Sequence, residues 1–344
     1  MATAQDADFD GISDQLEEEL ARRFAPEWRF HKEAPGDRSK QNKTEQFYPS
    51  SVEWWYNQVV KLTGKLPLLV YNGNSTLVQS LLRLDSMLVS GTTLSTSDTA
   101  WGRCNNKTIR IEYPKKIPGD PEGFPTYYRC YPLGNGWAGI CYLLFHPYDY
   151  KGSYCGLSFG NHRGDWEGIN VLVSGISDYS DSSAADNAFI EQVKYSGHGP
   201  KKYISSNSPH FSSVLGTHSK VYLSFGSHTP YPEPGEWHNY IVSGIVPNWY
   251  DDFFHGNGLV VQSWVPERKL INMGETVQTL VGWLNYKGLW GPDDNGGNSS
   301  SPGPPCKSVW SHELTSEHHT WEESLLQENY GAYWEKGFKK ILSR

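Results

Sequence analysis

The stretch richest in reactive side chains is "GNHRGDWEGINVLV", residues 160–173, where a histidine and two carboxylates precede an apolar run. His162, Asp165 and Glu167 form the pattern His-x-x-Asp-x-Glu, and the alternation that follows from Ile169 is typical of a strand. On a strand, Asp165 and Glu167 share one face, with their Cα atoms roughly 7 Å apart. Two carboxylates at such a short separation need a positive partner or a shared proton.

Two kinds of partner satisfy this pair. One is a divalent cation, with Mg²⁺, Ca²⁺ or Mn²⁺ favoured by the hard carboxylate oxygens and His162 folding back as a third ligand. The other is an ion pair with Arg163, together with hydrogen bonds from turn amides. The spacing alone leaves both open, so the metal-ligand candidates are His162, Asp165 and Glu167.

Two further histidines lie in turns of small residues beside expected strands. His198 occurs in "YSGHG" and His228 in "SFGSHTPYP". Each turn can bring its histidine toward the Asp165 face, and we take His228 and Asp165 as the candidate catalytic pair. The alternative is that both histidines only hold their turns through backbone hydrogen bonds. Two histidines with one carboxylate also match an iron oxygenase triad, although such donors suit many metals.

Aromatic residues, 14% of the chain, gather in two segments. The segments are "EWW" at 53–55 and "PNWYDDFFHG" at 247–256, and the candidate substrate-binding residues in them are Trp54, Trp55, Trp249, Tyr250, Phe253 and Phe254. Four aromatics beside two acids in an expected loop are typical of ligand binding. The same side chains could instead fill the core.

The elements that must position these residues are mainly strands. Residues 27–310 contain short apolar or alternating runs, such as "GICYLLF" and "KVYLSF", punctuated by Gly, Pro and Asn. This pattern predicts one domain, mainly β, built as an antiparallel β-sandwich with short helices. The N-terminal segment, residues 1–26, carries a predicted helix over 14–24 capped by Asp14. Leucines at helical spacing predict another helix near 75–88.

The last part of the chain differs in composition. Residues 291–305, "GPDDNGGNSSSPGPP", predict a flexible linker. Within 311–344 a broad apolar stripe predicts a C-terminal helix over about 317–342. We favour packing on the sandwich over a membrane-surface or partner helix, and a role as a lid stays open.

Net charge and composition exclude several classes of binding partner and cofactor. A net charge of -8 argues against nucleic acid as a partner, and no run is apolar enough for a transmembrane segment. The N-terminus lacks the pattern of a secretory signal, so we expect a soluble cytoplasmic protein. The five cysteines form no Cys-x-x-Cys pair, which favours reduced thiols. No nucleotide-binding loop, dinucleotide fingerprint, nucleophile elbow or zincin helix occurs, so no organic cofactor is expected.

Several motifs carry a resemblance. "HRGDWEGINVLV", "LARRFAPEWRFHKEA", "FYPSSVEWW", "VKYSGHG", "YLSFGSHTPYP" and "YKGLWGP" together resemble the vacuolar protein sorting 62-type domain family over about residues 19–310. The first motif is also similar to the Gly-His-Arg-His-Asp-Trp-Glu heptapeptide of necrosis-inducing, ethylene-inducing peptide-like proteins. That second resemblance implies a β-sandwich with a divalent metal at His162, Asp165 and Glu167, although Gly164 replaces the second histidine of the heptapeptide.

Three functions remain open from the sequence. The first is an enzyme without organic cofactor that folds a small hydrophobic substrate, terpenoid or polyketide-like, for cyclisation, cycloaddition or isomerisation in specialised metabolism. The absence of catalytic motifs and the wealth of aromatics favour it. The alternative is a lipid- or glycan-binding β-sandwich protein with membrane damage as its effect. A trafficking or scaffold role is the third.

Overall fold

A computed structural model describes the parts of the chain that form the sheets and their helices. The described residues are 5–7, 10–32, 45–71, 74–77, 109–113, 116–150, 153–154, 157–158, 161–196, 203–237, 252–274, 283, 289–291 and 303–304. The predicted linker at 291–305 is therefore described only at 291, 303 and 304, and the predicted C-terminal helix lies outside these residues.

The larger sheet has the strand order β11-β10-β9-β6-β5-β18. Its strands are β5 (Thr126–Gly134), β6 (Trp137–Asp149), β9 (His162–Ser174), β10 (Phe189–Tyr195), β11 (Tyr203–Ser205) and β18 (Leu270–Asn272). The central pair, β6 and β9, is antiparallel with 13 residues in each strand. β18 pairs with β5 in the parallel direction. The pairing of β6 with β9 fixes the positions of the residues at their ends.

The smaller sheet has the order β12-β13-β1-β17, with β14 also paired to β13. Its strands are β1 (Glu27–Phe30), β12 (Ser213–Val214), β13 (His218–Leu223), β14 (Pro230–Tyr231) and β17 (Val260–Gln262). β1 runs parallel to β13 and antiparallel to β17. Each of the two sheets thus contains one parallel pair, which a purely antiparallel scheme does not include.

Helices and short strand pairs surround these sheets. The helices are α1 (Asp14–Phe24), α2 (Val52–Thr63) and the 3₁₀ helix η3 (Ser182–Asn187). The remaining strands are β2 (Leu68–Tyr71), β3 (Asn74–Leu77), β4 (Ile109–Glu112), β7 (Ser153–Tyr154), β8 (Leu157–Ser158), β15 (Glu236–Trp237) and β16 (Asp252–Phe253). None of the helices in these ranges is long and apolar enough to cross a membrane.

The helix predicted at 14–24 is present with those bounds, and its cap differs from the prediction. Ser13 Oγ accepts a hydrogen bond from the backbone N–H of Leu16, so Ser13 and not Asp14 is the N-cap. The helix predicted near 75–88 was wrong at its start, because residues 74–77 form strand β3. Residues 78–88 lie outside the described part of the chain.

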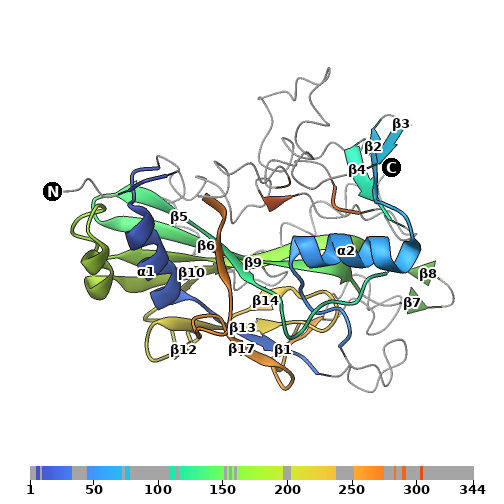
Figure 1. Cartoon of the computed structure of the whole chain (residues 1–344). Helices are drawn as coiled ribbons and strands as arrows, with labels where there is room; N and C mark the ends of the chain where they lie inside the picture. Colours follow the sequence, from blue (N-terminus) through green and yellow to red (C-terminus); the bar gives the residue numbers. More distant parts are fainter. Residues whose placement is uncertain are drawn as a thin grey trace, which may run out of the picture.

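The two sheets pack face to face and confirm the β-sandwich (Figure 1). Their shared core contains Leu144 of β6, Ile169 of β9 and Val221 of β13, together with the apolar face of α1. The opposite face of the larger sheet carries a second core under α2, which includes Trp55, Phe145, Trp166, Trp283 and Trp290. The larger sheet is therefore covered on both faces.

Candidate metal centre

The ends of β6 and β9 bring a carboxylate and an imidazole into contact. The strand register places Asp149 opposite His162 and His146 opposite Asp165. His162 Nε2 lies 3.0 Å from Asp149 Oδ2, and both side chains are almost fully buried. Asp149 is the last residue of β6 and His162 the first of β9, so this contact forms where the two strands leave the sheet.

Asp165 joins this pair to form a group of three donors, the Asp149 group (Asp149, His162 and Asp165). One ligand atom from each residue lies within 4.8 Å of the others, and all three residues are buried. A regular strand would direct His162 and Asp165 to opposite faces. Gly164 lies between them with φ +68°, which breaks the alternation. The left-handed backbone of Gly164 therefore allows the side chains of His162 and Asp165 to lie on the same side of the strand.

The hydrogen bonds of the two carboxylates differ. Asp165 Oδ1 accepts a bond of 2.8 Å from the backbone N–H of Trp166. Asp149 Oδ1 is buried and has no hydrogen-bond partner among the described residues. Two buried carboxylates and an imidazole with ligand atoms this close form a donor set that fits a hard divalent cation, which would also fill the free acceptor of Asp149.

Glu167 and Arg163, the other charged residues of the opening motif, make different contacts. Glu167 is not part of the Asp149 group, and its Oε2 accepts a 2.7 Å hydrogen bond from Ser196 Oγ. One terminal nitrogen of Arg163 donates to the carbonyl of Tyr113, and the guanidinium carbon lies 5.9 Å from the centre of that ring. The structure thus groups His162 and Asp165 with Asp149, a residue that the sequence did not single out.

His228 lies near this group but does not belong to it. It is fully buried and stacks on His146, with ring centroids 3.9 Å apart and planes at 11°. His228 Nε2 lies 3.6 Å from Glu45 Oε2. His146 in turn is the register partner of Asp165, so His146 is a strand neighbour of one predicted catalytic residue and a stacking partner of the other.

Glu45 is the buried acid of this histidine stack. Burial alone would raise the pKa of Glu45, but the charge of His228 opposes it, together with hydrogen bonds from His228 and from the backbone N–H groups of Phe47 and Gly226. The net result is a lowered pKa, so Glu45 is ionised at neutral pH.

The aromatic residues predicted to line a substrate cavity mostly take part in packing. Trp55 is fully buried in the core under α2, and the half-buried Trp54 packs against the same core. Phe254 stacks on Tyr231 with centroids 3.6 Å apart, and Phe253 is buried. Trp249, Tyr250 and His198 lie outside the described residues.

Comparison with known proteins corrects the predicted family. No family model and no curated protein matches the sequence. Solved structures of necrosis- and ethylene-inducing proteins match instead, so the predicted resemblance to the vacuolar protein sorting 62-type family was wrong.

Three of these structures illustrate the likeness. The non-toxic protein HaNLP3 is 13% identical over 80% of this chain and 81% of its own, with a TM-score of 0.33. NLPPya in complex with glucosamine is 15% identical over 88% and 92%, with a TM-score of 0.34. Necrosis and ethylene inducing protein 2, from the causal agent of witches' broom disease of cocoa, is 15% identical over 85% and 92%, with a TM-score of 0.33. At these values the likeness does not establish a function for this chain.

Proposed function

We propose that this protein is a divalent-cation-dependent binding protein whose ligand is a glycan or the headgroup of a lipid. The observation that carries the proposal is the Asp149 group, in which two buried carboxylates and an imidazole have their ligand atoms within 4.8 Å of one another. A Mg²⁺, Ca²⁺ or Mn²⁺ ion held there supplies coordination positions for oxygen atoms of a ligand.

The number of donors supports binding of a further molecule. Asp149, His162 and Asp165 offer three donor atoms, whereas Mg²⁺ and Ca²⁺ prefer six or more. The remaining positions are available to water or to hydroxyl oxygens. An uncharged, hydroxyl-rich ligand also suits a chain of net charge -8, which repels anions at long range.

The first function drawn from the sequence, a cyclase or related enzyme with an aromatic-lined cavity, gains no support from the described part of the chain. Trp55 and Phe254 contribute to packed aromatic clusters there, as a core residue does. The binding alternative needs only the cation group and an accessible rim. His162 provides that rim, since 11% of its side chain is exposed against 3% for Asp149.

Metal content tests the first half of the proposal. The protein is stripped with EDTA, dialysed against Mg²⁺, Ca²⁺ or Mn²⁺, and analysed by mass spectrometry for bound metal. We expect about one ion per chain in the wild type and a loss of at least tenfold in affinity in Asp149→Asn. The matched control is Asp186→Asn, which makes the same chemical change at an exposed position of η3. A wild-type protein that takes up none of the three ions would refute the proposed site.

Ligand binding tests the second half. The metal-loaded protein is screened on a glycan array and against vesicles that carry glycosylated lipids. We expect binding that disappears in EDTA and in Asp149→Asn but persists in Asp186→Asn. Metal uptake without any cation-dependent binding would assign the ion a purely structural role and refute the binding function.

A further inference from the structure

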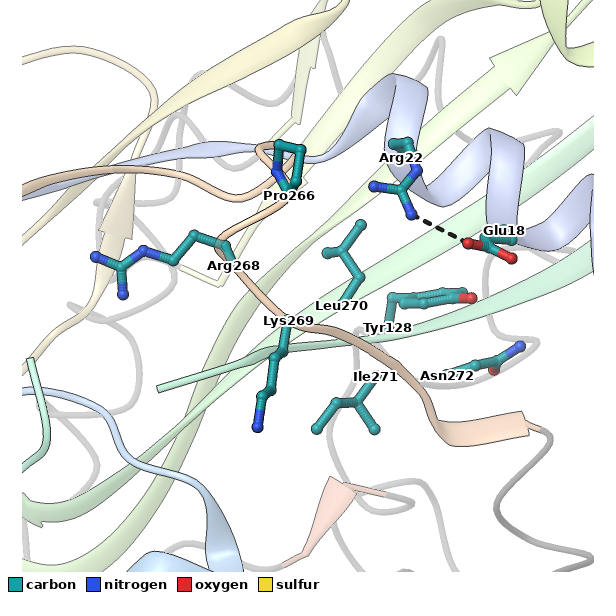
Figure 2. Close-up of a pocket in the computed structure, with 9 residues that line it drawn as sticks. All are labelled: Glu18, Arg22, Tyr128, Pro266, Arg268, Lys269, Leu270, Ile271 and Asn272. Atoms are coloured by element: carbon teal, nitrogen blue, oxygen red, sulfur yellow. Dashed lines mark hydrogen bonds and ion pairs between the residues drawn. The ribbon is translucent and has the colours of Figure 1, made fainter. Parts of the chain in front are cut away.

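A second concave feature lies away from the Asp149 group, between α1 and β18. It is a cavity of about 530 Å³, within the usual size range of small-molecule sites. Figure 2 shows Glu18 and Arg22 on α1, Tyr128 on β5, and the segment from Pro266 to Asn272 along the other side. None of these residues belongs to the Asp149 group.

The cavity is bordered by positive charge in an acidic protein. Arg22, Arg268 and Lys269 carry three positive charges against the single negative charge of Glu18. The chain as a whole has a net charge of -8. A concave site of locally inverted sign attracts anions, because the concave shape focuses the field of its charges.

Arg22 is the cation best placed to exchange its partner. Its Nη2 lies 3.0 Å from Glu18 Oε1, one helical turn away, with the two side chains 45% and 63% exposed. Such exposed pairs are weak and screened, so an incoming anion can displace Glu18. In Figure 2 the guanidinium of Arg22 faces the segment that carries Pro266 and Leu270.

Arg268 and Lys269 border the cavity from the other side. One terminal nitrogen of Arg268 donates to the carbonyl of Glu122 at 2.8 Å, and the guanidinium lies 5.4 Å from the ring centre of Phe124. The carbonyl of Lys269 accepts a 2.9 Å bond from the N–H of Thr126, which fixes its backbone beside β5. Figure 2 shows both side chains pointing away from α1. The three cations therefore lie at different edges of the cavity and do not converge on one point.

We propose that this cavity binds a small organic molecule that carries an oxyanion, either a phosphate ester or a carboxylate. Arg22 makes the direct contact, since the planar guanidinium matches both groups. Arg268 and Lys269 supply the attractive field. The dispersed cations suit a ligand of molecular size better than a single chelated ion. This site stands apart from the cation site and does not depend on the function proposed above.

The test uses the full chain after treatment with EDTA and dialysis into metal-free, EDTA-free buffer at constant ionic strength, so that the Asp149 group holds no metal that could bind an anion and no chelator competes for the cavity. Glucose 6-phosphate, glucuronate and glucose are titrated by calorimetry and by ligand-observed NMR. We expect an anionic sugar to bind at least tenfold more tightly than glucose. Tighter binding of glucose 6-phosphate identifies a phosphate site, and tighter binding of glucuronate identifies a carboxylate site. Equal binding of all three, or of none, overturns the proposal.

Three variants are expected to differ in their affinity for the preferred anionic sugar. Arg22→Gln should weaken binding about fivefold or more, because it removes the direct contact. Glu18→Gln should strengthen binding about two- to fivefold, because it removes the competing carboxylate. Lys61→Gln, at an exposed position in the last turn of α2, should change nothing.

Other results contradict the assignment. Weaker binding in Glu18→Gln shows that Glu18 supports the ligand and does not compete with it. An equal loss in Lys61→Gln and Arg22→Gln shows that the anion responds to overall charge and not to this cavity. Melting temperatures and circular dichroism verify that each variant is folded. Asp149→Asn should retain anion binding, which separates this site from the cation site.

Discussion

Replacement of Gly164 by alanine should damage both the stability of the sandwich and the Asp149 group. Gly164 has φ +68°, and a Cβ atom there would lie 2.4 Å from the carbonyl oxygen of Trp290 and 2.7 Å from its Cβ. Trp290 is fully buried and packs against Trp55, Phe145 and Trp166. The new methyl group can be accommodated only if β9 or Trp290 moves.

The magnitude follows from two contributions. A left-handed backbone at alanine costs about 1–2 kcal/mol. Displacement of Trp290 adds part of the roughly 3–5 kcal/mol by which removal of a buried aromatic residue destabilises a core. We therefore expect Gly164→Ala to lower the free energy of unfolding by about 2–5 kcal/mol, as measured by urea denaturation monitored by tryptophan fluorescence.

Gly64→Ala is the matched control for this prediction. Gly64 is the C-cap of α2 with φ +66°, and an added Cβ would meet nothing within 4 Å. This variant should lose only the contribution from the left-handed backbone, about 1–2 kcal/mol. Equal losses in the two variants would refute the clash with Trp290. Gly164→Ala should also weaken binding of a divalent ion, whereas Gly64→Ala should not.

Three further outcomes are expected. The pKa of Glu45 lies below its ordinary value of 4.5, so the ionised carboxylate stabilises the fold above pH 4.5 and this stabilisation is lost as the pH falls through the lower folded pKa. Glu45→Gln should therefore flatten the melting profile below pH 4.5, and an unchanged profile would show that Glu45 does not contribute to it. Burial raises the pKa of Cys141, so its thiol should resist iodoacetamide in the native state and react in urea, as followed by peptide mass spectrometry. Ser13→Ala should destabilise the protein by about 1 kcal/mol through loss of the helix cap, whereas Ser180→Ala, at an exposed turn, should have little effect in the same denaturation assay.

The alternation of apolar residues was sufficient to predict the sandwich but not its strand partners. Ile169, Val171 and Val173 all face the core between the sheets, as the period of two requires. The parallel pairing of β1 with β13 joins segments almost two hundred residues apart, and each strand has only the local pattern of any buried strand. Leucines at helical spacing misled the prediction after residue 74, because β3 begins there.

The candidate site shows a similar division between local and long-range information. His162 and Asp165 were visible as a motif because they are three residues apart. Asp149 was missed because it lies at the end of an apolar run and reaches His162 only through the register of β6 with β9. The aromatic candidates illustrate a different difficulty, since the size and polarity of Trp55 or Phe254 are the same in a core as in a pocket.

The position of Asp149 and His162 at the two ends of one connection has a consequence for variation of this protein. An ion bound by both residues would cross-link the base of the segment 150–161, as a disulfide would, because one donor precedes that segment and the other follows it. The entropy of closing a loop grows only slowly with length, by about 0.6 kcal/mol for each doubling. Changes in the length of this segment should therefore cost little while Asp149 and His162 keep the register of β6 with β9.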